Sequence, residues 1–202
     1  MKKIIFATGN EGKLKEIRTI LRDLPVEVLS LKEADIQVDI VEDGATYEAN
    51  ALIKVRAIRP FTDAIILADD SGLEVDYLDK APGVLSARFM GEDTSYTIKN
   101  QAIIDQLNGV EQDARTGRFV CAIAASFPNG NEEIALATME GVIAKEIVGK
   151  NGFGYDPIFY LPDYQKTSAE LTPDEKNKIS HRGKALRKMA EILKKRIVQD
   201  GE

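Results

Sequence analysis

The sequence of 202 residues contains no tryptophan, one cysteine and one histidine. One cysteine cannot form a disulfide within the chain, and no second histidine is present to complete a histidine-based zinc site. Cys121 lies in the apolar run Phe119–Ile123, so we predict a buried structural thiol without a catalytic role.

Long apolar runs are also missing. None approaches the ~20 residues that span a bilayer, and the apolar stretch after Lys3 is too short for a signal peptide. We therefore expect a cytoplasmic protein that does not associate with membranes. Because internal repeats, low-complexity segments and a Ser/Gly/Pro-rich linker are absent as well, we expect one continuous domain over residues 1–202.

A basic excess is the third missing feature. Asp and Glu number 33 against 27 Lys and Arg, which gives a net charge of -6. This balance argues against a nucleic-acid polymer as partner, but it allows a small anion in a local basic pocket.

The pattern of the 44% hydrophobic residues predicts the α/β class with a mixed sheet. The spacing predicts strands over 2–7, 64–68, 118–127 and 132–144, with a hairpin at 128–131 and an antiparallel second half. Helices are expected over 12–24, 46–58 and 95–107, with two more after Thr172 and Ser180. In the second helix, Lys54 is expected to face outward.

Three clusters are typical of ligand sites. The first is the strand-to-helix segment "TGNEGK", which places Lys13 and Lys15 in a first helical turn, where the helix dipole favours anions. A bound phosphate would make these cations favourable, with close approach at Gly9 and Gly12 and a donor at Asn10. The spacing is not that of a Walker A loop, and an ordinary turn with solvated lysines is the alternative.

The second cluster, Asp69–Gly72, follows the strand at 64–68, where open α/β sheets bind ligands. Its adjacent carboxylates suit Mg²⁺, and Glu42 or Asp43 could supply another. The alternative is a tight turn, which uses the same residue types.

The third cluster is the loop "GFGYDP" at 152–157, whose aromatic and acidic residues suit stacking and hydrogen bonding to a base. Simple packing is the alternative. Further along, His181 and Arg182 again bring donors to the start of a helix. Together the clusters indicate a nucleoside triphosphate site.

The motifs "TGNEGK", "EDGATYEANA", "ADDSGLEVD", "APGVLSARF", "GKNGFGYDPIF" and "EKNKISHRGKAL" occur in this order over residues 4 to about 197. Their combination resembles the inosine triphosphate pyrophosphatase family, which acts on non-canonical purine nucleoside triphosphates. The resemblance implies two lobes around a long mixed sheet flanked by helices, an active site in the cleft between the lobes, and a homodimer. It also implies Mg²⁺-dependent hydrolysis of ITP, dITP and XTP to the monophosphate and pyrophosphate.

The resemblance also implies residue roles. Asp70 is the proton acceptor for the attacking water, and Glu42 and Asp70 hold the magnesium ion. The implied substrate-binding residues are Thr8, Gly9, Asn10, Glu11, Gly12, Lys13, Ser71, Phe153, Gly154, Tyr155, Asp156, Lys176, His181 and Arg182. Lys54 is a weaker candidate for phosphate contact, while Asp69 and Arg88 are left outside the catalytic set.

Selectivity is expected at position six of the purine, because hypoxanthine and xanthine offer a carbonyl there and adenine offers an amino group. A donor such as Arg182 or a backbone N–H would reject ATP. Two other readings are a pyrophosphatase of the related Maf type and a nucleotide-binding regulatory module without turnover. The paired carboxylates argue against the module, since negative charge beside phosphates helps only when a metal intervenes.

Overall fold

The computed structural model describes residues 2–8 and 10–199. The chain divides into two compact units. Unit 1 comprises residues 1–70, 121–137 and 182–202, and unit 2 comprises residues 71–120 and 138–181. One mixed sheet has the strand order β2-β1-β3-β4-β5-β6-β7, and its strands β3 (Ile65–Val75), β4 (Thr116–Ser126) and β5 (Glu132–Ile143) have residues in both units. The expected α/β class with a mixed sheet is confirmed.

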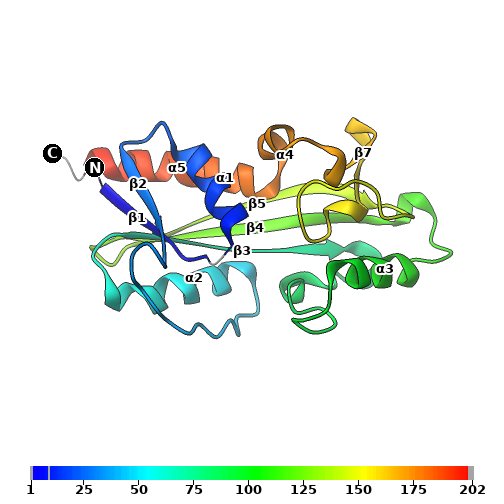
Figure 1. Cartoon of the computed structure of the whole chain (residues 1–202), viewed down its shortest axis with the longest axis horizontal. Coiled ribbons are helices and arrows are strands. Elements are labelled where there is room, and N and C mark those ends of the chain that lie inside the picture. Colours follow the sequence, from blue (N-terminus) through cyan, green and yellow to red (C-terminus); the bar gives the residue numbers. More distant parts are fainter. Residues whose placement is uncertain (1, 9, 200–202) are drawn as a thin grey trace. The chain divides into compact units, whose positions relative to one another are not determined.

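Unit 1 is built on parallel strands. β1 (Lys2–Phe6) pairs in parallel with β2 (Val26–Ser30) on one side and with the start of β3 on the other. Helices α1 (Glu11–Leu21) and α5 (His181–Gln199) cover one face of these strands, and α2 (Tyr47–Ile58) covers the other (Figure 1). The antiparallel pattern predicted for the second half appears where β5 pairs with β6 (Phe159–Leu161) and β6 with β7 (Lys166–Thr167).

The core of unit 1 follows from strand alternation and helix periodicity. Ile4, Phe6, Ile65 and Leu67 point to the face that α1 and α5 cover. Helix residues at a spacing of three or four pack against them, and these are Leu14, Ile17, Leu21, Leu186, Met189 and Leu193. Cys121 belongs to this core, and burial raises the pKa of its thiol to about 12, which confirms the structural role predicted for it.

Unit 2 contains α3 (Tyr96–Gln106) and α4 (Pro173–Ile179). Its core joins Ile103 and Leu107 to Leu73 and Val75 of β3, and also contains the aromatic residues Phe119, Tyr155 and Phe159. The predicted capping residues start the helices as expected: Thr46 accepts a hydrogen bond at α2, Ser95 at α3, and Thr172 forms a capping box with Glu175 at α4.

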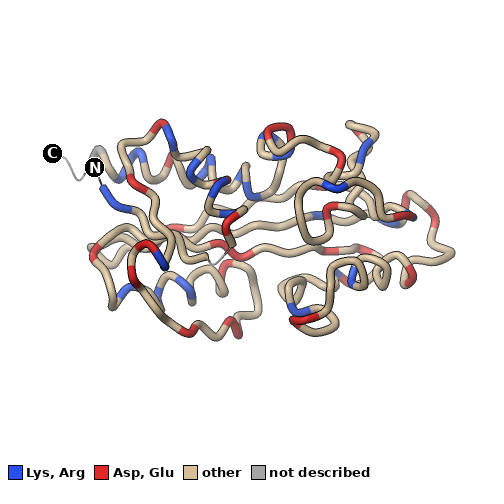
Figure 2. Tube along the Cα trace, in the orientation of Figure 1, with Lys and Arg blue, Asp and Glu red and all other residues tan. Residues whose placement is uncertain are grey.

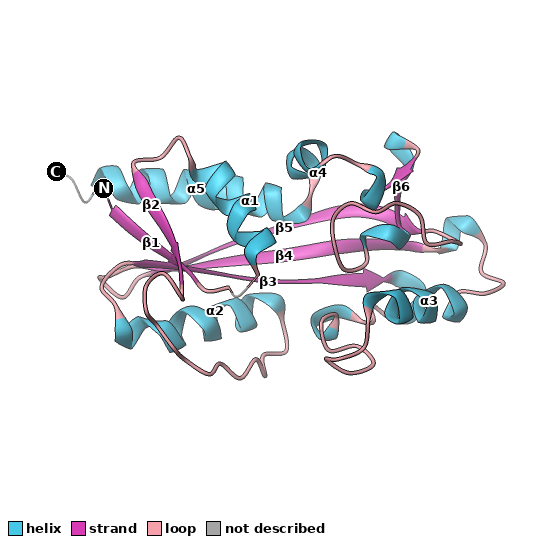
Figure 3. Cartoon of the chain, viewed as in Figure 1, coloured by secondary structure: helices cyan, strands magenta, loops and turns pink. Residues whose placement is uncertain are grey.

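The prediction for β3 was too short. The strand continues past Ala68 through Asp69, Asp70 and Ser71 to Val75, so these residues are extended strand and not a turn (Figure 3). Asp, Ser and Gly disfavour strands only weakly, and here both flanks of the segment are buried and paired within the sheet.

Charged residues of both signs are interspersed along the chain, and Lys and Arg recur on α1 and α5 (Figure 2). Within the described part of the chain, no helix combines the length and apolar character needed to cross a membrane.

Candidate active site

Asp69 and Asp70 are consecutive residues of β3, and successive side chains of a strand point to opposite faces. Asp69 continues the face of Ile65 and Leu67, which α1 and α5 cover, while Asp70 points to the face covered by α2. The two carboxylates are almost completely buried, with exposed fractions of 1% and 8%. Each must therefore find its own charged partners.

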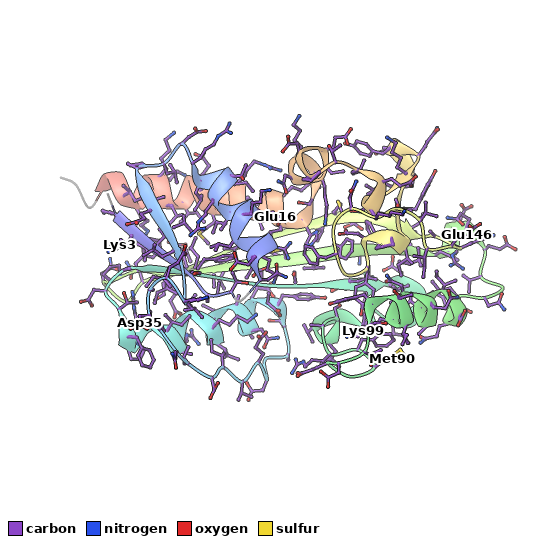
Figure 4. All side chains as sticks on the ribbon, viewed as in Figure 1. Lys3, Glu16, Asp35, Met90, Lys99 and Glu146 are labelled. Carbon is purple, nitrogen blue, oxygen red and sulfur yellow. The ribbon has the colours of Figure 1, made fainter. Side chains whose placement is uncertain are left out.

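Asp69 is held by two cations. The ammonium of Lys13 lies 2.9 Å from Oδ2 of Asp69 and 3.0 Å from Oδ1. Nε of Arg182 donates to Oδ2 at 3.1 Å, and Nη1 of Arg182 donates to Glu16 of α1, which is labelled in Figure 4, also at 3.1 Å. Although burial acts to raise it, these two cations hold the pKa of Asp69 well below its ordinary range.

Asp70 lies in a different environment. Nδ2 of Asn50 donates to Oδ2 of Asp70 at 3.1 Å, and the Lys54 ammonium lies 3.6 Å from Oδ1. Lys54 also lies 2.7 Å from Oε2 of Glu42, which belongs to the loop between β2 and α2 (Figure 3). Burial raises the pKa of the Asp70 carboxyl above its ordinary value, against the opposing effect of Lys54.

Lys54 corrects one expectation. The helix pattern placed it on the outer face of α2, but its side chain is buried and its ammonium also donates to the carbonyl of Asp69 at 2.9 Å. Although burial acts to lower it, the carboxylates of Asp70 and Glu42 raise the pKa of Lys54, so the ammonium stays charged. A buried lysine is tolerated because it is surrounded by acidic and carbonyl oxygens.

The first predicted cluster forms the start of α1. Oδ1 of Asn10 accepts a hydrogen bond from the Lys13 backbone at 3.2 Å, and Oγ1 of Thr8 accepts one from the Asn10 backbone at 3.1 Å. Glu11 and Gly12 form the exposed first turn, and Gly9 lies outside the described residues. In this structure the charge of Lys13 is therefore explained by Asp69, while Lys15 remains at the surface.

The third predicted cluster lies in unit 2 and is organised around Asp156, which is 2% exposed. The Lys176 ammonium lies 2.6 Å from Oδ2 of Asp156, and Ser168 donates to Oδ1 at 2.9 Å. The Phe153 backbone N–H donates to Oδ2 at 2.8 Å, and the Lys176 ammonium lies 4.9 Å from the centre of the Phe153 ring. The structure thus brings together Phe153, Asp156 and Lys176, three of the residues that the resemblance assigned to substrate binding.

Other predicted residues of unit 2 are less accessible. Tyr155 is buried, and its hydroxyl donates to the Ser86 carbonyl at 2.7 Å. Gly154 adopts φ +67° and its carbonyl accepts a hydrogen bond from Asn100 at 3.1 Å. The His181 ring is buried and stacks on Phe119, with ring centres 4.8 Å apart. Among these three predicted residues, only Gly154 has a partly exposed surface.

Arg182 and Ser71 complete the predicted set. The guanidinium of Arg182 is 3% exposed and binds Asp69 and Glu16, so contact with a base would require it to leave these carboxylates. Ser71 follows Asp70 in β3 and is partly exposed. Asp69, which sequence reasoning left outside the set, is the partner of both Lys13 and Arg182.

The carboxylate oxygens of unit 1 are suitable ligands for a divalent cation. Oxygen atoms of Glu42 and Asp70 converge on the Lys54 ammonium, so the protein already balances one positive charge between them. Mg²⁺ uses one or two protein carboxylates and completes its shell with water and phosphate oxygens. Within residues 2–8 and 10–199, no group of three or more His, Cys, Asp or Glu side chains is arranged around a common point, so the rest of such a shell would come from ligand and solvent.

Sequence reasoning missed Asn50 and Ser168. Both are buried and bind a predicted carboxylate, Asn50 at Asp70 and Ser168 at Asp156. Asn50 stands inside a helix, four residues after the N-cap Thr46, where asparagine has low propensity, and this was the available signal. Ser168 has no comparable signal, because serine is common in loops.

The fold and the buried carboxylate–lysine cluster define an α/β protein with a charged centre at the middle of a sheet strand. The model of the Ham1 family matches residues 4–192. The chain belongs to the Ham1 family, which confirms the resemblance inferred from the six motifs.

Curated relatives cover nearly the whole chain. A protein of Clostridium perfringens named dITP/XTP pyrophosphatase is 46% identical over 200 residues, covering 96% of this chain and 98% of its own. A protein of Desulforamulus reducens with the same name is 50% identical over 191 residues, covering 95% of each chain.

Solved structures agree with the fold. A HAM1 protein from Coxiella burnetii matches with a TM-score of 0.89 and 42% identity, covering 96% of this chain and all of the other. The Ham1 protein of Staphylococcus aureus matches with a TM-score of 0.87 and 36% identity, over 96% of this chain and 100% of that one.

Proposed function

We propose that this protein hydrolyses the non-canonical purine nucleoside triphosphates ITP, dITP and XTP to the monophosphate and pyrophosphate, and so removes deaminated purines from the nucleotide pool. The observation that carries the proposal is the convergence of Asp70 and Glu42 on one positive charge, beside a second lysine at the start of α1. The names of relatives up to 50% identical support the choice of substrate.

Asp70 is the proposed proton acceptor. Burial raises the pKa of its carboxyl, which makes the carboxylate a stronger base toward a water molecule than an exposed aspartate. The water that it orients attacks the α-phosphorus in line with the departing pyrophosphate. Lys13 and the N-terminus of α1 are proposed to offset the negative charge of the phosphates.

Glu42 and Asp70 are the proposed magnesium ligands. The bound ion would neutralise charge on the phosphate oxygens. The lysine side chains alone would neutralise only part of this charge. In the nucleotide-bound protein, Lys54 is proposed to keep its contact with the Asp69 carbonyl and to turn its charge toward phosphate.

The loop around Asp156 is proposed to hold the purine. Phe153 is 42% exposed and is the proposed stacking residue, and Asp156 and Lys176 fix the loop that carries it. A hydrogen-bond donor opposite position six of the purine would bind the carbonyl of hypoxanthine or xanthine, and it would face the amino group of adenine without a hydrogen bond. Because Arg182 is engaged by two carboxylates and the His181 ring is buried against Phe119, we assign that donor to a backbone N–H of the loop.

We further propose a cytoplasmic homodimer. Unit 2 exposes four large apolar side chains, Tyr77, Leu85, Met90 and Ile98, each more than half exposed. A second copy of the chain would cover them. Sedimentation of the wild type and of Met90→Glu tests this: a wild-type monomer at micromolar concentration would refute the dimer, and dissociation by Met90→Glu would support it.

The test of the function is pyrophosphate release from ITP, XTP, GTP and ATP by the purified protein, with Mg²⁺ or with EDTA. Turnover of ITP and XTP only with Mg²⁺ is expected. Nucleotide binding without turnover of any of the four would favour the regulatory module instead.

A further inference from the structure

Asn50 is a buried polar residue that the proposed reaction does not yet use. It lies in the first turn of α2, which begins at Tyr47, and its exposed fraction is 0%. A buried amide without hydrogen bonds is costly, and asparagine is a weak helix former, so a purely structural helix position would favour an apolar residue or alanine. The neighbours of the Asn50 side chain explain why an amide stands here.

The two ends of the amide bind two different segments. Oδ1 accepts a hydrogen bond from the backbone N–H of Gly44 at 2.8 Å, and Nδ2 donates to Oδ2 of Asp70 at 3.1 Å. The donor must face the carboxylate and the acceptor must face the N–H, so both contacts require the same orientation of the amide. The side chain therefore connects the loop before α2 to β3.

The segment that Gly44 belongs to also carries Glu42. With Gly44 tied to Asn50, Glu42 lies two residues away, and its Oε2 reaches the same Lys54 ammonium as Oδ1 of Asp70. Asn50 binds Oδ2 of Asp70, so Oδ1 is the oxygen that is turned toward Lys54 and Glu42. One amide thus fixes the carboxylate of Asp70 and the backbone next to Glu42.

The close approach of the loop requires glycine. A Cβ at position 44 would lie 2.6 Å from Oδ1 of Asn50 and 2.9 Å from Cβ of Ala49. These distances are too short for any side chain without a shift of the loop or of the helix. The hydrogen bond between Gly44 and Asn50 therefore depends on both residues.

We propose that Asn50 is a positioning residue, whose amide sets the distance and orientation between Asp70 and the Glu42 segment so that both carboxylates face one divalent cation and one water molecule. This inference rests on the proposed function of Asp70 and Glu42. Asn50 itself touches neither the cation nor the substrate.

Two substitutions separate the contacts. Asn50→Ala removes both, while Asn50→Asp keeps the shape and the acceptor for Gly44 but places a second carboxylate against Asp70, where like charges repel. The control is Thr46→Ala, which removes the N-cap of the same helix, where Thr46 accepts from the Ala49 backbone at 3.1 Å, and leaves Asp70 untouched. Any effect of a weakened α2 appears in all three variants.

The first measurement is steady-state hydrolysis of ITP. Loss of a residue that orients a metal ligand costs about 10–100-fold in activity or metal affinity, so we expect kcat of Asn50→Ala and Asn50→Asp to fall by this factor. KM for ITP is expected to change by less than about threefold, because the phosphate and base contacts remain. Thr46→Ala is expected to keep the wild-type kcat.

The second measurement needs no turnover. Binding of Mn²⁺ to each folded variant, followed by the loss of the free-ion electron paramagnetic resonance signal, is expected to weaken about 10-fold or more in Asn50→Ala and to stay unchanged in Thr46→Ala. If the wild type binds Mn²⁺ but hydrolyses no nucleotide, the proposed function fails, and this arm still decides the role of Asn50.

The inference is overturned if both Asn50 variants keep kcat and Mn²⁺ affinity within about twofold of Thr46→Ala, because Asn50 would then only fill space. Should Asn50→Ala fail to fold, Gly44→Ala displaces the same contact from the loop side and must reproduce the loss of kcat. Wild-type kcat in a folded Gly44→Ala would also reject the proposal.

Discussion

Asp69 and Asp70 are adjacent in β3 but bind different lysines, Lys13 on one face of the sheet and Lys54 on the other. Their pKa values move in opposite directions. Burial raises the pKa of Asp70, which has the Lys54 ammonium at 3.6 Å, whereas Lys13 and Arg182 together outweigh burial at Asp69. A carboxylate of low pKa is a poor base, and one of raised pKa is a better base at neutral pH. This difference is consistent with the proposed roles, a structural one for Asp69 and proton transfer for Asp70.

Asp70→Asn is expected to lower kcat for ITP by at least about 100-fold, because the amide cannot accept a proton from water. The midpoint of thermal unfolding should be equal to that of the wild type or higher, since burial already disfavours the charged form of Asp70. Steady-state kinetics and calorimetry check both. Full activity of this variant would remove Asp70 from the proposed role.

Asp69→Asn is expected to destabilise the protein at pH 7. It removes the Asp69 carboxylate from both the buried guanidinium of Arg182 and the ammonium of Lys13, and breaking a buried ion pair costs about 3–5 kcal/mol. Urea unfolding of the wild type and the variant at pH 7 measures this difference. A difference near zero would show that the ion pairs contribute no net stability.

The ion pairs of Asp69 also predict that stability depends on pH. The folded pKa of Asp69 is lower than its ordinary value of 3.8, so its contribution to stability is complete above that value and is lost as the pH falls toward the folded pKa. The gap in unfolding free energy between wild type and Asp69→Asn should therefore be constant above pH 5 or so and narrow below about pH 4. A gap that does not change down to pH 3 contradicts the assignment.

Lys13→Ala is expected to weaken binding of the triphosphate about 10-fold or more and to leave the binding of inosine nearly unchanged, because a charged hydrogen bond to phosphate is lost. Lys15→Ala is the control, since Lys15 lies in the same turn of α1 but at the surface. Calorimetric titration with ITP and with inosine gives both affinities. Equal effects on the two ligands would place Lys13 outside the phosphate site.

Gly152→Ala is expected to raise KM for ITP. An added Cβ would lie 2.2 Å from Oδ2 of Asp156 and 3.3 Å from the Lys176 ammonium, so the contact that shapes the loop must break. Gly130→Ala is the matched control, because Gly130 also has positive φ (+83° against +73°) but an added Cβ there meets no atom within 4 Å. Each variant carries the left-handed backbone cost of about 1–2 kcal/mol, and only the first should change KM.

Much of this protein follows from local rules. Helix caps at Thr46, Ser95 and Thr172 are short-range hydrogen bonds between neighbours in the chain, so the sequence alone located these helix starts. Apolar, β-prone runs located β1, β3, β4 and β5 but not β2, β6 or β7, and the six motifs identified the family. The same motifs named Phe153, Asp156 and Lys176 as substrate-binding residues, but only the structure showed that the three contact one another.

Contacts between distant segments could be seen only in the tertiary structure. Lys54 and Asn50 lie on the face of α2 that meets β3, and a helix pattern cannot reveal that a lysine is buried when its partners, Asp70 and Glu42, come from a strand and a loop. Likewise, the extension of β3 through Asp69 and Asp70 depends on neighbouring strands that satisfy its backbone. Charge pairing and strand length are properties of the assembled sheet, and for this reason the sequence could name the two aspartates but not assign them to opposite faces.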